Sequence, residues 1–102
     1  EFRRIDLRVG TIVAAEPVPG ARKLLRLQVD IGEAAPRQLV AGLAEQFEPA
    51  HLLGRQVVVV ANLEPATIRG IESQGMILAA DDQGRLALLG PAAAMPNGAR
   101  IR

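Results

Sequence analysis

Several residue types are missing or rare in this sequence of 102 residues, which has no cysteine, tryptophan or tyrosine, one histidine and two phenylalanines. Without cysteine, disulfides and thiolate metal sites are excluded, and a reducing cytoplasm is the compartment that we expect. The lone histidine, His51, predicts no zinc site, because zinc takes three or four protein ligands. Neither common glycine motif for cradling phosphates is present, so the sequence predicts no metal and no cofactor.

Aromatic side chains and long apolar runs are also scarce. Proteins that hold single strands by base stacking need aromatic platforms, and this chain offers only Phe2 and Phe47. A bound nucleic acid would therefore be held through its phosphates and its folded shape. No apolar run approaches the roughly 20 residues of a membrane span, and no signal-peptide pattern follows the first residues. The first residue, Glu1, is not methionine, which suggests a fragment or a processed chain.

Basic residues are clustered, although the net charge is only +1. Bulk charge therefore argues weakly for nucleic acid, and the distribution of charge matters more. Arginine and lysine in an exposed loop can hold phosphate oxygens, but an ordinary solvated loop has the same composition. Both interpretations stay open for the two clusters, which are Arg22, Lys23 and Arg26, and Arg3, Arg4 and Arg8.

Alternation of apolar and polar residues predicts strands in the first half of the chain. We expect one strand over residues 5–15, ended by residues 16–20 (EPVPG), because two prolines and a glycine interrupt a ladder. The alternation over residues 25–31 is the clearest, with one face buried and the other wet. A shorter third strand is expected over residues 37–40.

The second half combines a short helix with further strands. Pro49 suits a first helical position and Gly54 a helix end, so we expect one or two helical turns between residues 43 and 54. The four valines at 57–60 indicate a strand buried on both faces. We further expect a loop over residues 66–71, a strand over 76–80, a hairpin turn over 81–84, a strand over 85–89, and a tail over 90–102 that forms an irregular arm or a short edge strand.

This order of elements predicts a single all-β domain over residues 1–102. Short strands separated by turn signals are typical of a small barrel. A helix between the third and fourth strands favours a five-stranded Greek-key β-barrel, the OB-fold, followed by a C-terminal extension. The alternative is an SH3-like barrel, which lacks this helix.

A polar loop over residues 72–75 is the main candidate site. Ser73 and Gln74 both donate and accept hydrogen bonds, and Gly75 permits a turn that most residues resist. The same composition fits a hydrogen-bonded turn without a ligand, so both interpretations remain open. As a nucleophile, Ser73 would need a base, and the only histidine is His51. We do not expect this dyad, and binding rather than catalysis is the expected function.

Four segments together resemble the tRNA-binding domain family. Residues 6–10 (DLRVG) and 21–25 (ARKLL) are similar to its opening, and residues 59–63 (VVANL) and 70–78 (GIESQGMIL) to its most diagnostic part. The similarity covers nearly the whole chain in order and spacing.

Two further segments indicate a branch of that family. Residues 48–55 (EPAHLLGR) and 96–102 (PNGARIR) are similar to the C-terminal domain of bacterial methionyl-tRNA synthetase.

The resemblance implies an OB-fold that binds the folded outer corner of tRNA without strong sequence preference and forms a homodimer. The expected partners are tRNA, a second copy, and the catalytic part of a synthetase in the same chain; no membrane partner is expected. A free-standing tRNA-binding protein or a chaperone-like interaction module is the alternative. The family's contact positions fall on Lys23, Asn62, Arg69, Ser73, Gln74 and Met76, with Arg22 and Arg37 as additions.

Two positions depart from the family pattern. Glu64 stands where lysine is frequent, which removes a positive charge near the expected surface. Ala41 stands where serine is usual, which removes a hydroxyl from an expected loop. Both departures predict weaker binding.

Overall fold

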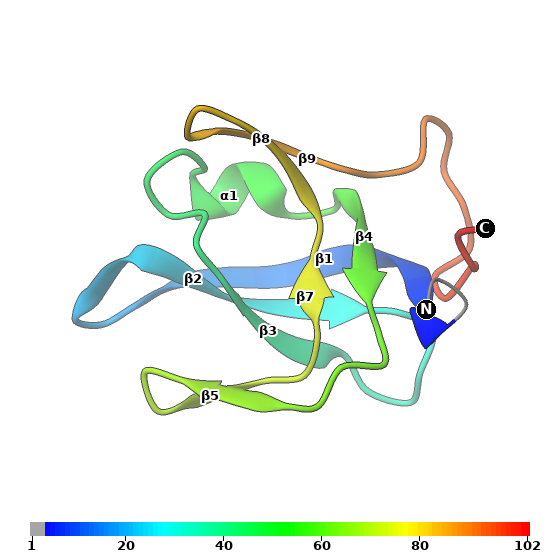
Figure 1. Ribbon diagram of the computed structural model, residues 1–102, viewed down its shortest axis with the longest axis horizontal. Helices are drawn as coiled ribbons and strands as arrows, with labels where there is room; N and C mark the ends of the chain where they lie inside the picture. The colour runs from blue at the N-terminus through cyan, green and yellow to red at the C-terminus, as the bar shows by residue number, and fades with distance from the viewer. Residues whose placement is uncertain (1–3) are drawn as a thin grey trace.

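The computed structural model describes residues 4–102, and most of its strands form one antiparallel sheet in the order β3-β2-β1-β4-β7 (Figure 1). Two small hairpins, β5–β6 and β8–β9, extend from it. The predicted all-β fold is confirmed. The strands are β1 (Leu7–Val18), β2 (Ala21–Asp30), β3 (Arg37–Ala41), β4 (Gln56–Val60), β5 (Ala66–Ile68), β6 (Ile71–Ser73), β7 (Met76–Ile77), β8 (Ala79–Asp82) and β9 (Arg85–Leu88).

The predicted short helix is present between β3 and β4 as α1 (Pro49–Leu52). Proline suits its first turn because that position needs no backbone N–H donor. Leu52 is completely buried, so the helix closes one end of the core, as expected for an OB-fold and not for the SH3-like alternative. Within residues 4–102, no helix is long and apolar enough to cross a bilayer.

The core lies on the inner face of the bent sheet. In β2, Leu25, Leu27 and Val29 are buried while the residues between them are partly exposed, which confirms the predicted alternation. In β4, the four valines 57–60 are all buried, as expected for a strand covered on both faces.

The break expected over residues 16–20 is wrong, because β1 continues through Pro17 and ends at Val18. Pro17 pairs with Leu25 of β2 and lies next to a register shift, where a missing N–H donor does little damage. The turn is only Pro19-Gly20, with Gly20 at φ 78°. As a result β2 begins at Ala21, four residues before the strand expected at 25.

The loop expected over residues 66–71 is also wrong, since β5 and β6 form a hairpin there. The strand expected over 76–80 is divided into β7 and the first half of β8. Asp81 and Asp82, expected in a turn, belong to β8, and the turn itself is Gln83-Gly84, with both residues at positive φ.

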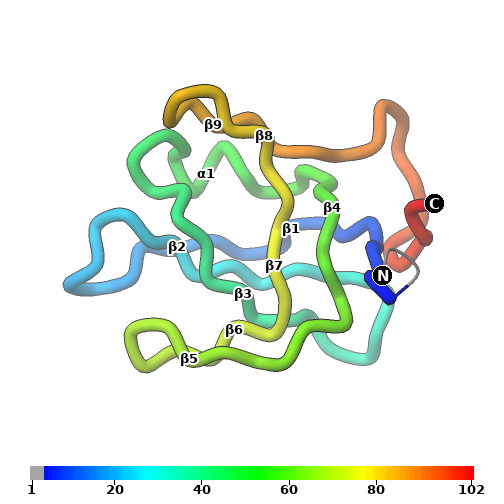
Figure 2. Tube along the Cα trace, viewed as in Figure 1, coloured from blue at the N-terminus to red at the C-terminus, as the bar shows by residue number. Residues whose placement is uncertain are grey.

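The tail over residues 90–102 is an irregular arm that runs back beside the start of β1 (Figure 2). Its backbone bonds to β1 include Val9 N–H to Ala99 O at 2.8 Å and Ile101 N–H to Leu7 O at 3.0 Å. The arm therefore covers an edge of β1 that β2 leaves free, and the C-terminus lies at the same end of the molecule as the start of β1 (Figure 1).

Candidate nucleic-acid interface

A wide bulge in β2 exposes the first of the two basic clusters. Consecutive β1 residues Pro17 and Val18 pair with Leu25 and Ala21, so residues 22–24 of β2 have no partner on β1. Bulges bend a strand and redirect its side chains, which is why they occur near binding sites. Arg22 and Lys23, expected in a loop, instead lie in this bulged strand segment, and both are exposed.

The tip of the β5–β6 hairpin presents a third cation. Ile68 pairs with Ile71, which leaves Arg69-Gly70 as a two-residue turn with φ values of 53° and 80°. Positive φ at both central positions is the type I′ geometry that suits the twist of a hairpin. Arg69 is exposed at this tip. The tip and the β1–β2 turn lie at the end of the molecule opposite the C-terminus (Figure 1).

The β1–β2 hairpin and the β5–β6 hairpin flank an open groove of about 900 Å³. Arg22 and Lys23 line it from the β2 bulge, and Arg69 lines it from the β5–β6 tip. No acidic side chain within residues 4–102 lines it. The rest of the lining comes from the bulge and its turn: Pro17, Val18, Gly20, Ala21 and Leu24. Three cations without a counter-charge therefore converge over an aliphatic floor, an arrangement that attracts phosphate oxygens.

Ser73 lies in the interior instead of on a recognition loop. It is only 4% exposed, and its hydroxyl accepts a hydrogen bond from Val40 N–H and donates one to Gly75 O, both at 3.0 Å. The hydroxyl oxygen thus serves as the acceptor for Val40 N–H, in place of the carbonyl that a neighbouring strand would supply. The bond from Val40 holds β6 against β3, and the bond to Gly75 O fixes the turn that follows β6, so the hydroxyl is occupied by the fold.

Gln74 and Gly75 complete the same contact with β3. Gln74 forms a backbone bond to Gln38 O at 2.8 Å, and its side-chain oxygen accepts Gln38 N–H at 2.9 Å. Gly75 has φ 153°, and an added Cβ would lie 2.9 Å from Val60 O. Glycine is therefore required by close packing at this position. This segment joins the two ends of the sheet and fixes where the β5–β6 hairpin projects.

Arg37 ties three distant parts of the chain together. Its Nη1 donates to Ala61 O at 2.5 Å and to Gln74 O at 3.0 Å, while Nε and Nη2 pair with the Glu33 carboxylate at 2.9 and 2.8 Å. These bonds raise the pKa of Arg37 and lower that of Glu33. The guanidinium is committed to the protein and does not line the cationic groove.

Asn62 and Met76 lie outside the groove and differ in role. The Asn62 side-chain oxygen accepts Asp6 N–H at 2.9 Å and its amide nitrogen donates to Arg4 O, so Asn62 fixes the start of the described chain. Met76 pairs with Val60 in β7 and is 56% exposed, so its thioether is free to contact a ligand.

Ser73 and His51 do not form the dyad. His51 is exposed on α1, while the Ser73 hydroxyl is buried and donates its proton to Gly75 O. Within residues 4–102, no group of three or more His, Asp or Glu residues could hold a metal ion.

The two departures from the family pattern fall in different environments. Glu64 is exposed and lies two residues before β5, away from the Arg69-Gly70 tip of the hairpin. Ala41 was expected in a loop, but it is the last residue of β3. It pairs with Leu25 and packs, partly buried, against the core. A serine at position 41 would therefore place its hydroxyl at the edge of the core and not in the groove.

Sequence reasoning missed the aliphatic floor of the groove. Val18, Ala21 and Leu24 belong to segments that were expected to be a break and a loop. The available signal was Pro19-Gly20, a two-residue turn between apolar residues that pair as Val18 and Ala21.

Comparison with known proteins places this arrangement among tRNA-related proteins. A sequence family described as "Putative tRNA binding domain" matches residues 7–100. The methionine–tRNA ligase of Methanothrix thermoacetophila is 57% identical over 102 residues, which are 100% of this chain and 15% of that protein. The ligase of Deinococcus radiodurans is 52% identical over 103 residues, with coverages of 100% and 15%. The chain thus spans about 15% of the length of these curated relatives.

Solved structures with the same fold include two chains that this domain covers almost completely. A MetRS-related protein from Pyrococcus horikoshii superposes with a TM-score of 0.91 and 35% identity, covering 99% of this chain and 93% of that chain. The chaperone CsaA from Bacillus anthracis gives 0.89 and 34%, with coverages of 99% and 93%. The C-terminal domain of Plasmodium vivax p43 gives 0.94 and 31%, with coverages of 100% and 62%.

Proposed function

This chain belongs to the tRNA-binding domain family, and we propose that it is a non-catalytic domain that binds tRNA through the groove between the β1–β2 and β5–β6 hairpins. The observation that carries the proposal is the convergence of Arg22, Lys23 and Arg69 on one groove, which no acidic side chain of the described residues lines. Clustered cations of this kind neutralise phosphates and release counterions, which is the main source of affinity in such complexes.

The proposed contact divides the eight expected site residues into two groups. Lys23, Arg22 and Arg69 would hold phosphates, and exposed Met76 would pack against an unpaired base. The other four support the fold through the bonds described above and would act on tRNA only by positioning the hairpins; these are Arg37, Asn62, Ser73 and Gln74. A folded corner of tRNA, which offers converging backbones, suits a groove between two projecting tips.

The relatives suggest where the domain works. Since the chain corresponds to 15% of two methionine–tRNA ligases, we propose that it is a C-terminal appendage of such an enzyme, with the catalytic part as its neighbour. A cytoplasmic location and a homodimer are part of the same proposal, and sedimentation of the isolated domain at micromolar concentration tests the dimer. A purely monomeric domain would contradict that part alone.

A chaperone-like interaction module is the second candidate, favoured by the similarity to CsaA. Exposed apolar residues on the C-terminal arm, Met95 and Ile101, would supply its contact surface. Binding of an unfolded polypeptide without affinity for tRNA would support this candidate over the first.

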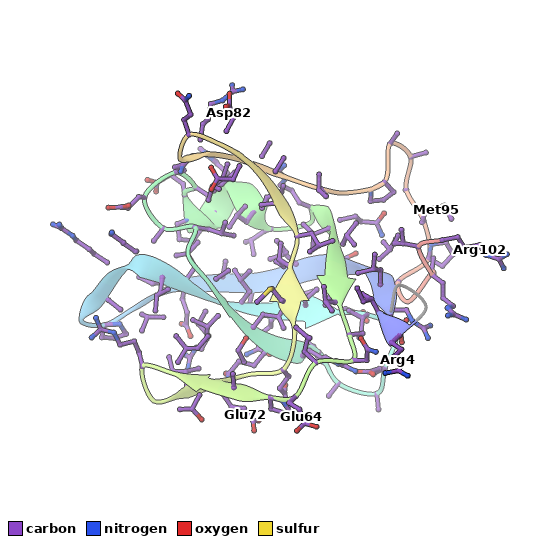
Figure 3. The ribbon with its side chains drawn as sticks, in the orientation of Figure 1. Arg4, Glu64, Glu72, Asp82, Met95 and Arg102 are labelled. Atoms are coloured by element: carbon purple, nitrogen blue, oxygen red, sulfur yellow. The ribbon has the colours of Figure 1, made fainter. Side chains whose placement is uncertain are left out.

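Filter-binding titrations against total tRNA, repeated across a salt series and with duplex DNA as competitor, test the main proposal. Lys23→Ala and Arg69→Ala should each weaken tRNA binding and lower the slope of log K against log salt by about 0.7–0.9, because each removes one phosphate contact. Arg102→Ala is the matched control, since it removes the same charge at the opposite end of the molecule (Figure 3). Its affinity should stay close to that of the unaltered domain.

Equal tRNA affinity in Lys23→Ala, Arg69→Ala and Arg102→Ala at controlled salt would contradict the groove. A circular dichroism spectrum of each variant confirms that the fold has survived the change.

A further inference from the structure

The cationic groove is more than a charged surface. Phosphates can be held by cations on a flat face, whereas this groove is a hollow of about 900 Å³, within the roughly 300–1,000 Å³ typical of sites that enclose a small ligand. Its floor is aliphatic and consists of the buried Val18 and Ala21 and the partly exposed Leu24. An apolar hollow next to phosphate-binding cations calls for a ligand that is apolar in one part and anionic in the next.

The cations over this floor also have a suitable shape. Two of the three are arginines, Arg22 and Arg69, and planar guanidinium groups stack on nucleobases in place of aromatic rings. Among residues 4–102, no aromatic residue lines the groove, so none of them offers a ring for stacking there. The bulge that carries Arg22 is anchored by Ala44 N–H donating to Lys23 O at 3.1 Å, which fixes the backbone under these side chains.

We propose that the groove takes up one unstacked nucleobase of a looped or bulged RNA, an inference that rests on the proposed tRNA binding. One face of the base packs on the floor formed by Val18, Ala21 and Leu24. The guanidinium of one arginine, Arg22 or Arg69, covers the other face, and Lys23 and the remaining arginine hold adjacent phosphates.

Charge and base pairing select this ligand. Three cations without an acidic partner in the lining favour a polyanion over an apolar peptide segment. A paired base must be unstacked and unpaired before it can enter, which costs a few kcal/mol, whereas a base in a loop or bulge is already free. The groove should therefore prefer RNA with at least one extruded base over a continuous duplex of equal charge.

The test compares two RNA duplexes that differ in one group. Both carry a single-nucleotide bulge, with adenine at the bulge in one and an abasic nucleotide in the other, so charge and backbone are identical. Fluorescence anisotropy at fixed salt should show the adenine RNA binding about tenfold more tightly, as expected for one stacked base. Arg22→Lys and Arg69→Lys keep the charge and remove the planar face. In the double variant the affinity ratio should fall towards one while the salt slope stays unchanged.

Two failures can be told apart. If the unaltered domain binds total tRNA but gives a ratio of one for the bulge pair, the base pocket is overturned and the proposed function stands. If it binds neither tRNA nor either duplex, the proposed function fails and the pocket with it. An unchanged adenine preference in the double lysine variant would overturn the role of the guanidinium groups.

Discussion

Removal of the Ser73 hydroxyl should destabilise the fold without touching the ligand. In Ser73→Ala, the N–H of Val40, a residue only 8% exposed, loses its acceptor in the interior. Leaving such a group unsatisfied costs about 1–3 kcal/mol. The carbonyl of Gly75, in contrast, is in a partly exposed residue and can turn to water. We therefore expect a loss of about 2 kcal/mol in the free energy of unfolding, a large part of the 5–15 kcal/mol typical of a domain.

Urea denaturation followed by circular dichroism measures this loss. With a denaturant dependence of about 2 kcal/mol per molar, the midpoint should fall by about 1 M. Thr67→Val is the matched control, because it removes an exposed hydroxyl from the same hairpin and keeps a β-branched side chain; it should change stability by less than about 0.5 kcal/mol. Where Ser73→Ala is still folded, its tRNA affinity should match that of the unaltered domain. Unchanged stability together with a tenfold loss of tRNA binding would show instead that the hydroxyl contacts the ligand.

Two further predictions concern the ion pairs. Arg37→Ala leaves two backbone carbonyls without their donor and should lower the free energy of unfolding, measured by urea denaturation, by about 1–3 kcal/mol. Arg26→Ala breaks only an exposed ion pair and should lower it by less than about 1 kcal/mol. Equal losses in the two variants would contradict the bridging role of Arg37. Hydrogen bonds from arginines lower the pKa of Asp6 and of Glu33, so these carboxylates stabilise the fold above about pH 4 and lose that contribution as the pH falls through their lowered pKa values. The fall in melting temperature on acidification should be smaller in Glu33→Gln, and an identical acid profile would refute the linkage.

The regular parts of the fold could be predicted from local patterns. The alternation over residues 25–31 and the valines at 57–60 report burial directly, because side chains in a strand alternate between faces or are covered on both. Pro49 marked the helix start for an equally local reason. The three cations of the groove were also candidates, since Arg22 and Lys23 are adjacent in the sequence and Arg69 is a position that the family resemblance implies.

The remainder depends on contacts that a local pattern does not contain. Pro17 looks like the end of a strand, and only the pairing of β1 with β2 shows that the ladder resumes across a bulge. Arg69 conceals a type I′ turn, because arginine is uncommon at φ 53°, where asparagine or glycine would have indicated a hairpin. Ser73 is polar and therefore looks exposed, but its partner Val40 is 33 residues away in the sequence.

The segment that carries most of the resemblance to the family is the one that closes the sheet, and this affects how the family match bears on binding. Residues 73–75 are fixed by bonds to β3 and by packing against Val60 O, so their identities follow from the fold. A protein could share this segment and still lack the cations of the groove. Affinity for RNA should therefore follow Arg22, Lys23 and Arg69, while the closing segment decides only whether the β5–β6 tip stands opposite the β2 bulge. Variants of the three cations should therefore lose RNA binding at unchanged stability. Variants of residues 73–75 should lose stability first and RNA binding only as the fold is lost.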